Sequence, residues 1–580
     1  MNDINRFVIK IAGESGQGVN SIGEMVAKAL KRTGFYTFGY REYPSLIKGG
    51  YAFHQIDLSS TPINSSSEKA DIMLNFSRTS FHVYLPTLRE NARVIHMIPK
   101  LDLTGAEEKL IKKNKYKIFY LPAEDLAKEA GGKAIMANSV MFGALWKLLG
   151  LPVPVVKSLI SALFEHKPEA INPNLKSFEK GYETDLDTNF KIKITTSAKA
   201  KSQLLLTGNH LLALGGVASG VRTYFAYPMT PSSSILSYMA QIYHDTGILV
   251  KQLDDEVSVA QFALGANFMG TRALVATSGG GFDLMTESVS LSAMTETPFV
   301  CVLAQRPGPA TGMPTWTSAA DLNLAVYSGH GEFPRCVIAV SDAKSAILAV
   351  QKAFDIAEKY QIPVIILTDK QIAESLFQIP DPEKEIEVKR YLVSKNMLST
   401  LKSSDRFKIT ESGISPRWLP GQSEATYIAN SDEHLEDGTV TEDRQSSLEM
   451  NQKRLDKLKT LTIELPEPEL IGPDDASLTL VGWGSAKNTV ADVIDLWNPL
   501  HKNGKINFLH YEYIYPVKTQ KLIGLIEKKR PLLLIENNAF GQLGALLAKE
   551  TGFIFRDKLL KFDGRPFFIE DIINYLEKRF

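Results

Sequence analysis

Thr230 stands in a stretch whose residue types are typical of a ligand-binding turn, Tyr224-Phe225-Ala226-Tyr227-Pro228-Met229-Thr230-Pro231. A strand-like run ends at Tyr227, and the Thr-Pro-Ser-Ser segment after it opens an amphipathic helix. We expect Thr230 at the N-cap and Pro231 at the first helical position. This placement directs a hydroxyl and backbone N–H groups off the carboxyl end of a parallel strand, where open α/β sheets bind ligands. The alternative is that Thr230 only caps the helix.

Two more candidate features follow predicted strands in the same region. Asp254-Asp255-Glu256 opens a helix predicted from Val257 to Met269, and Ser278-Gly279-Gly280-Gly281 turns from a buried strand into another helix. Arg306 follows the next apolar strand. Acidic residues at a helix start complement the helix dipole, so Glu256 is either such a residue or a functional carboxylate.

A glycine-rich turn lies near the N-terminus, Gly13-Glu14-Ser15-Gly16-Gln17-Gly18, between a strand predicted for Arg6 to Ala12 and a helix from Ser21 to Arg32. This layout offers backbone N–H groups to a phosphate. Its spacing is G-x-x-G-x-G rather than the dinucleotide G-x-G-x-x-G, and a tight turn without a ligand explains it equally well. Lys48, beside Gly49-Gly50, would reach a phosphate or a partner, or belong to a solvated loop.

Composition excludes several classes of protein. Lysine plus arginine equals aspartate plus glutamate, so no basic excess attracts nucleic acid or an anionic membrane. No apolar run approaches the length of a membrane span. The two cysteines, Cys301 and Cys336, lie in apolar runs, which predicts buried reduced thiols and a cytoplasmic protein. Two cysteines cannot hold a four-thiolate iron–sulfur cluster. His434 lies between acids in a predicted solvated loop, with no second histidine near it to share a metal.

Strands alternate with helices along most of the chain, which predicts α/β architecture with doubly wound sheets. A lysine- and serine-rich linker and a long polar segment interrupt this alternation. We expect three α/β domains at 1–190, 202–377 and 466–580, a linker at 191–201 and a polar connecting segment at 378–465.

Several motifs resemble those of the 2-oxoacid:ferredoxin oxidoreductase α subunits. Tyr227–Ser232 is similar to their Tyr-Pro-Ile-Thr-Pro-Ser signature, and Thr277–Phe282 to their Thr-Ser-Gly turn. Gln305–Thr315 and Lys561–Phe567 match two later blocks. The turn at Gly13–Val19 resembles that of the family's γ domain. The resemblance covers nearly the whole chain in the order γ, then α.

The resemblance implies an enzyme that oxidatively decarboxylates a 2-oxoacid on thiamine diphosphate, with coenzyme A taking the acyl group and ferredoxin the electrons. It implies a γ domain first, then a domain that contacts the aminopyrimidine ring, and last a domain like the C-terminal domain of transketolase. A β subunit would supply the diphosphate- and Mg²⁺-binding domain and a 4Fe–4S cluster, which makes a hetero-oligomer. The sequence lacks the Gly-Asp-Gly diphosphate signature, in agreement with a split site.

The resemblance also assigns roles to the candidate residues. Glu256 would hydrogen-bond N1′ of the aminopyrimidine, and Thr230 would hydrogen-bond the 2-oxoacid. Gly279-Gly280 would contact the thiamine cofactor. The family's contacts to coenzyme A would be made by the turn that contains Gly13, Gly16 and Gly18, or by Lys48 and the glycines after it.

One position departs from the family. A basic residue commonly follows the Pro-Thr of its Gly-x-Pro-Thr block, but Trp316 stands there, and tryptophan cannot form a bidentate ion pair with a carboxylate. Trp316 favours a monocarboxylate unless an arginine such as Arg306 compensates. We expect 2-oxoglutarate, because this γ–α arrangement is common in that branch, with pyruvate or another 2-oxoacid as the alternative. A non-catalytic scaffold subunit is a further alternative, and a transketolase-type enzyme acting alone would need the missing diphosphate signature.

Overall fold

The computed structural model describes residues 6–46, 49–186, 190, 192–381 and 386–580. The chain forms two compact units. The first comprises Met1–Leu206, Ser375–Asp381 and Phe568–Phe580, and the second comprises Thr207–Glu374 and Pro382–Phe567. Across the described ranges, no helix is long and apolar enough to cross a membrane.

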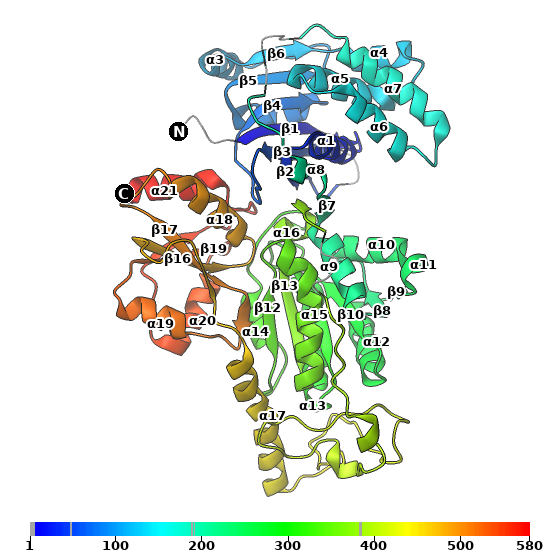
Figure 1. The fold of residues 1–580 in the computed structure, drawn as a ribbon, viewed down its shortest axis with the longest axis vertical. Coiled ribbons are helices and arrows are strands. Elements are labelled where there is room, and N and C mark those ends of the chain that lie inside the picture. The colour runs from blue at the N-terminus through cyan, green and yellow to red at the C-terminus, as the bar shows by residue number, and fades with distance from the viewer. Residues whose placement is uncertain (1–5, 47–48, 187–189, 191, 382–385) are drawn as a thin grey trace. The chain divides into compact units, whose positions relative to one another are not determined.

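The first unit is built on an eight-stranded mixed sheet (Figure 1). Its strands, in spatial order, are β6 (Lys117–Tyr120), β5 (Leu88–His96), β4 (Ala70–Asn75), β1 (Arg6–Ser15), β3 (Gly49–Ser59), β2 (Tyr36–Glu42), β14 (Leu376–Ile379) and β7 (Leu204–Thr207). Its helices are α1 (Val19–Thr33), α2 (Arg78–Tyr84), α3 (Gly105–Asn114), α4 (Ala123–Glu129), α5 (Ala137–Leu149), α6 (Val153–Leu163), α7 (Pro168–Tyr182), α8 (Ala198–Lys201) and α21 (Ile569–Arg579).

Half of this sheet is antiparallel, which the alternation of strands and helices did not predict. Strand β3 pairs antiparallel with both β1 and β2, whereas β1, β4, β5 and β6 pair parallel. The connection from β2 to β3 is too short for the crossover that parallel strands need, so it forces an antiparallel pair. Helix α1 follows β1 directly, and its buried residues Val26 and Leu30 join Ile9 and Ile11 in the core.

The second unit contains two sheets that are parallel except at one edge each. The seven-stranded sheet has the order β18 (Tyr513–Tyr515), β12 (Cys336–Ala339), β13 (Pro363–Asp369), β11 (Phe299–Gln305), β10 (Ala273–Thr277), β8 (Thr223–Ala226) and β9 (Leu249–Gln252). The five-stranded sheet has the order β15 (Glu469–Ile471), β17 (Ile506–Tyr511), β16 (Leu478–Trp483), β19 (Leu532–Glu536) and β20 (Asp557–Leu560). The antiparallel edge strands are β18 and β15. The predicted α/β class is confirmed.

Helices flank the two sheets of the second unit, with α17 lying away from both sheets (Figure 1). They are α9 (Gly208–Ala218), α10 (Ser233–Gln241), α11 (Tyr243–Thr246), α12 (Glu256–Phe268), α13 (Gly279–Met294), α14 (Leu322–Tyr327), α15 (Ala343–Tyr360), α16 (Lys370–Glu374), α17 (Arg444–Glu464), α18 (Ala486–Trp497), α19 (Gln520–Glu527) and α20 (Gln542–Thr551). Strand residues Cys301 and Leu303 pack with Ala263 of α12 and Phe282 of α13, because alternate strand residues share a face. Both cysteines are buried and unpaired, as predicted.

The polar connecting segment belongs to the second unit from Pro382 onward, and a few of its polar side chains are buried there. Glu296 is fully buried between Lys453 and Lys457 of α17, each with its Nζ 2.5 Å from a carboxylate oxygen. The prediction that His434 lies in a solvated loop was wrong, since its ring is buried, with Nδ1 2.8 Å from the Leu435 carbonyl oxygen and Nε2 3.3 Å from that of Met294. Glu296, Lys453 and Lys457 are thus buried because their charges pair with each other, although charged residues are usually exposed to solvent.

Candidate active site

Glu256 is the first residue of α12, which begins after a short turn at the carboxyl end of β9. Asp255 is the N-cap, and its Oδ1 accepts a hydrogen bond from the Ser258 N–H at 2.7 Å. Because Asp255 caps the helix, Glu256 is not needed for that task. Glu256 is 4% exposed, and its Oε1 is buried without a hydrogen-bond partner in the described structure. A buried carboxylate oxygen without a donor is costly, which indicates that the position awaits a ligand N–H or O–H.

The first turn of α13 lies against this carboxylate. A Cβ atom on Gly281 would lie 2.6 Å from Glu256 Oε1 and 2.0 Å from Thr277 Oγ1, so only glycine fits there. The hydroxyls of Thr277 and Ser278 are also buried without partners in the described structure. Of the two glycines named from sequence, Gly279 packs on the Asp321 carboxylate, and Gly280 has open space above it. Sequence reasoning missed Gly281, although it belongs to the same glycine run.

Thr230 does not occupy the predicted N-cap. Helix α10 begins at Ser233 with Ser232 as its N-cap, so Pro231 is not the first helical residue. A turn intervenes, because the Ser232 N–H and hydroxyl both donate to the Met229 carbonyl oxygen, at 2.9 and 2.7 Å. Thr230 is half-buried, after the carboxyl end of β8. A residue outside the helix start cannot be explained as its cap.

Arg306 and Thr230 are brought together by the order of the parallel strands. The Arg306 Nη1 donates to the Thr230 carbonyl oxygen at 2.7 Å. Burial lowers the pKa of Arg306, which remains a cation at neutral pH. Burial, with repulsion from Asp283, raises the pKa of Asp321 to about 6, against the opposing attraction of Arg306. This edge of the sheet therefore combines a hydroxyl, a guanidinium and two carboxyls, those of Glu256 and Asp321.

Trp316 stacks on a cation from the C-terminal part of the second unit. The Arg565 guanidinium lies 3.8 Å from the centre of the Trp316 ring system, within cation–π distance. The backbone supports this placement, because the Thr317 N–H donates to the Gly564 carbonyl oxygen at 3.1 Å. A positive charge thus lies beside the position where the family has a basic residue. Sequence reasoning did not find Arg565 because it comes from a distant segment.

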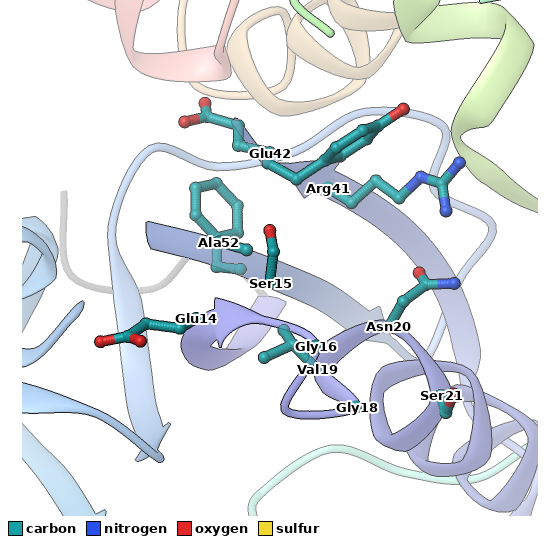
Figure 2. A pocket seen from close by; sticks show the side chains of 12 residues that line it. Glu14, Ser15, Gly16, Gly18, Val19, Asn20, Ser21, Arg41, Glu42 and Ala52 are labelled. Atoms are coloured by element: carbon teal, nitrogen blue, oxygen red, sulfur yellow. The ribbon is translucent and has the colours of Figure 1, made fainter. Parts of the chain in front are cut away.

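The N-terminal glycine turn borders a cavity of about 470 Å³ that lies wholly in the first unit (Figure 2). Gly16 and Gly18 line it and have φ values of 97° and 77°, in the left-handed region. Arg41 lies at one end of the cavity and Glu14 at the other (Figure 2). Gly13 does not line the cavity and instead packs on the side chains of Val19, Gln17 and Phe76. Lys48 lies outside the described residues.

No group of three or more metal-binding side chains occurs within the part of the chain that the structure describes. The orphaned Oε1 of Glu256, with the close approach that Gly281 permits, is instead suited to an organic ligand with a ring N–H. The predicted Glu256 contact to an aminopyrimidine fits this arrangement.

The sequence matches two family models. "Pyruvate flavodoxin/ferredoxin oxidoreductase, thiamine diP-bdg" covers residues 215–453, and "Pyruvate ferredoxin/flavodoxin oxidoreductase" covers residues 8–184. The 2-oxoacid:ferredoxin oxidoreductase subunit alpha of a Sulfolobus species is 30% identical, over 98% of this chain and 96% of that relative. The 2-oxoglutarate oxidoreductase subunit KorA of Mycobacterium tuberculosis is 24% identical, over 94% of this chain and 87% of its own length.

A solved structure resembles the whole chain. The 2-oxoglutarate:ferredoxin oxidoreductase from Magnetococcus marinus, with 2-oxoglutarate, coenzyme A and succinyl-CoA bound, aligns with a TM-score of 0.89 and 28% identity. The alignment covers 99% of this chain and all of that one. The fold described above is therefore that of a known 2-oxoacid oxidoreductase chain.

Proposed function

Since the chain belongs to the 2-oxoacid:ferredoxin oxidoreductase alpha subunits, we propose that it supplies one half of a split active site for a 2-oxoacid, with 2-oxoglutarate as the favoured substrate. One observation carries this proposal. Glu256 is buried beside the first turn of α13, and its Oε1 lacks a partner in the described structure.

Thiamine diphosphate supplies the electron sink that decarboxylation of a 2-oxoacid requires. Glu256 would hold a proton between its Oε1 and N1′ of the aminopyrimidine. Gly281 allows the approach, since any larger residue would collide with the carboxylate and with Thr277. The hydroxyls of Thr277 and Ser278 provide further polar partners on the same turn.

Thr230 and Arg306 would bind the 2-oxo and carboxylate groups. The Thr230 hydroxyl makes no hydrogen bond within the described residues, so it is available to a substrate oxygen. Arg306 uses Nη1 on the Thr230 carbonyl and keeps other N–H groups for a carboxylate. The Asp321 N–H donates to Oε1 of Gln305, the residue before Arg306, at 2.9 Å, and the Ser232 N–H donates to the Met229 carbonyl oxygen to close the turn around Thr230.

The choice of 2-oxoglutarate rests on the second carboxylate of that substrate. Arg565 lies over the Trp316 ring, which would help to position its guanidinium. The Arg565 Nη1 also donates to the Asp563 carbonyl oxygen at 3.0 Å, which fixes the fork further. This cation would stand in for the basic residue that Trp316 replaces. Pyruvate or another 2-oxoacid is the competing substrate.

A β subunit would complete the site with the diphosphate and Mg²⁺ ligands and a 4Fe–4S cluster, in a hetero-oligomer that reduces ferredoxin. Two buried, unpaired cysteines fit the reducing cytoplasm. Coenzyme A would reach the cavity of the first unit, where Arg41 and the N–H groups after Gly16 suit a phosphate. The Magnetococcus relative was solved with coenzyme A, which supports coenzyme A as a ligand of this chain.

The test is a substrate panel measured on the complex purified by a tag on this chain. Reduction of ferredoxin would be followed with 2-oxoglutarate, pyruvate and 2-oxobutyrate, each with and without coenzyme A. We expect the highest kcat/KM with 2-oxoglutarate and dependence on coenzyme A. Equal or higher kcat/KM with a monocarboxylate would overturn the substrate assignment, and no turnover with any 2-oxoacid would support a scaffold subunit.

A further inference from the structure

Three consecutive carbonyl groups around Thr230 are each held by a different donor. The Met229 oxygen accepts from Ser232, and the Thr230 oxygen accepts from Arg306. The Pro231 oxygen accepts from Asn209 Nδ2 at 2.8 Å. The turn that contains Thr230 is therefore held by Arg306, directly after β11, and by Asn209 of α9, as well as by its own serine.

Asn209 is built into the start of α9. It is fully buried, and the same Nδ2 also donates to Ser234 Oγ at 2.7 Å. The start of α9 packs closely on the backbone of α16, because a Cβ on Gly208 would lie 2.1 Å from the Ile372 carbonyl oxygen. Thr207 caps the helix by accepting from the His210 N–H. One amide thus connects the start of α9 to the Thr-Pro-Ser turn and to the first turn of α10.

The other half of this amide makes no hydrogen bond. Asn209 Oδ1 is buried and has no partner among the described residues. A half-satisfied buried amide is a poor choice for stability alone, since the unpaired acceptor keeps its desolvation cost. The Asn209 Nδ2 group, by contrast, donates hydrogen bonds to both the Pro231 carbonyl oxygen and Ser234 Oγ.

We propose that Asn209 is a positioning residue for the reaction, which sets the orientation of the Thr230 hydroxyl toward the 2-oxoacid by holding the Pro231 carbonyl and Ser234. This inference rests on the proposed function of Thr230. Asn209 acts through Thr230 and makes no contact with substrate of its own. Its loss changes how the substrate is held more than whether the chain folds.

The experiment compares Asn209→Ala with Asn267→Ala in the intact complex. Asn267 is a matched control, because it is 3% exposed and its Nδ2 also donates to a carbonyl, that of Ala273, at the far end of α12. We expect Asn209→Ala to lower kcat/KM for the 2-oxoacid by about tenfold or more, since small misplacements in a site cost that much. The control lowers the melting temperature similarly and leaves kcat/KM unchanged. Equal kcat/KM in both variants overturns the proposal.

A double variant separates positioning from a general structural effect. If Asn209 acts through Thr230, adding Asn209→Ala to Thr230→Ala changes kcat/KM by less than about twofold, because coupled residues are not additive. Full additivity overturns the proposal. If Thr230→Ala alone has no effect, the proposed function of Thr230 fails, and a fall caused by Asn209→Ala alone then excludes action through Thr230.

Asn209→Asp gives a readout that a purely structural role would not move. An ionised carboxylate cannot donate to the Pro231 oxygen, but a protonated one can. The activity of this variant relative to the unmodified complex therefore rises as the pH falls. A ratio that is constant with pH and close to one overturns the proposal. A low ratio that does not change with pH also counts against it when Asn209→Ala is as active as the unmodified complex.

Discussion

Replacement of Glu256 by glutamine removes a charge from the buried position that faces the first turn of α13. The two side chains have nearly the same volume, and Asp255 continues to cap α12, so the helix start should persist. The substitution removes the negative charge from the side chain whose Oε1 has no protein partner within the described residues. Hydrogen bonds to charged groups contribute about 1.5–3 kcal/mol, which corresponds to roughly 10- to 150-fold in rate.

Proton transfer adds to this effect, because a positioned acid–base group contributes about 10²–10⁴-fold. We therefore expect Glu256→Gln to lower kcat by about two orders of magnitude or more, with the complex assembled. The assay is 2-oxoacid-dependent reduction of ferredoxin, with thiamine diphosphate affinity measured by calorimetry on the same sample.

Asp255→Asn is the control, since asparagine caps a helix about as well as aspartate and leaves the neighbouring carboxylate in place. We expect that variant to keep nearly full turnover. A Glu256→Gln complex with turnover within a few-fold of the unmodified one would refute the role of the carboxylate. Glu256 would then be a helix-start acid with an unexplained burial.

Three further substitutions test separate parts of the account. Thr230→Ala should lower kcat/KM about tenfold with an unchanged melting temperature, because the residue caps no helix; a fall in melting temperature alone would contradict this. Arg565→Gln should lower kcat/KM for 2-oxoglutarate relative to pyruvate by about tenfold, and an unmoved ratio would place the cation outside the substrate site. Glu296→Gln leaves two buried lysines unpaired and should cost about 3–5 kcal/mol in chemical denaturation, against about 0–1 kcal/mol for the partly exposed control Glu464→Gln. Burial raises the pKa of Glu296, but those lysines outweigh it and hold that pKa well below its usual range. The free energy of unfolding that this ion cluster contributes should thus be present above about pH 4.5 and fade as the pH falls further. An unfolding free energy that does not change with pH below about 4.5 would count against the ion cluster.

Residues that act within one local motif were predictable from sequence. Glu256 lies at the start of its helix as expected, because an aspartate cap and a run of small residues determine that start locally. The prediction of an N-cap at Thr230 was wrong, since Ser232 hydrogen-bonds to the Met229 carbonyl oxygen and forms a turn before α10 begins. A Thr-Pro-Ser-Ser segment allows either arrangement, and sequence alone gives no reason to choose the later start.

Residues that join the site from distant segments were not predictable in the same way. Arg565 reaches Trp316 only because a loop after β20 lies against the loop after β11. Asn209 reaches the Thr-Pro-Ser turn only because the start of α9 lies beside that turn in the fold. The antiparallel half of the first sheet depends on a short connection rather than on hydrophobic pattern. The predicted domain boundaries and the roles of the site residues stay predictions.

The most direct test of the split site is turnover by this chain alone and in the presence of its co-purified partner. Both samples would receive thiamine diphosphate, Mg²⁺, coenzyme A, ferredoxin and a 2-oxoacid, and their visible spectra would be recorded. We predict turnover and an iron–sulfur absorption band only with the partner present. Substantial 2-oxoacid decarboxylation by the isolated chain would contradict the claim that its active site is one half of a shared one.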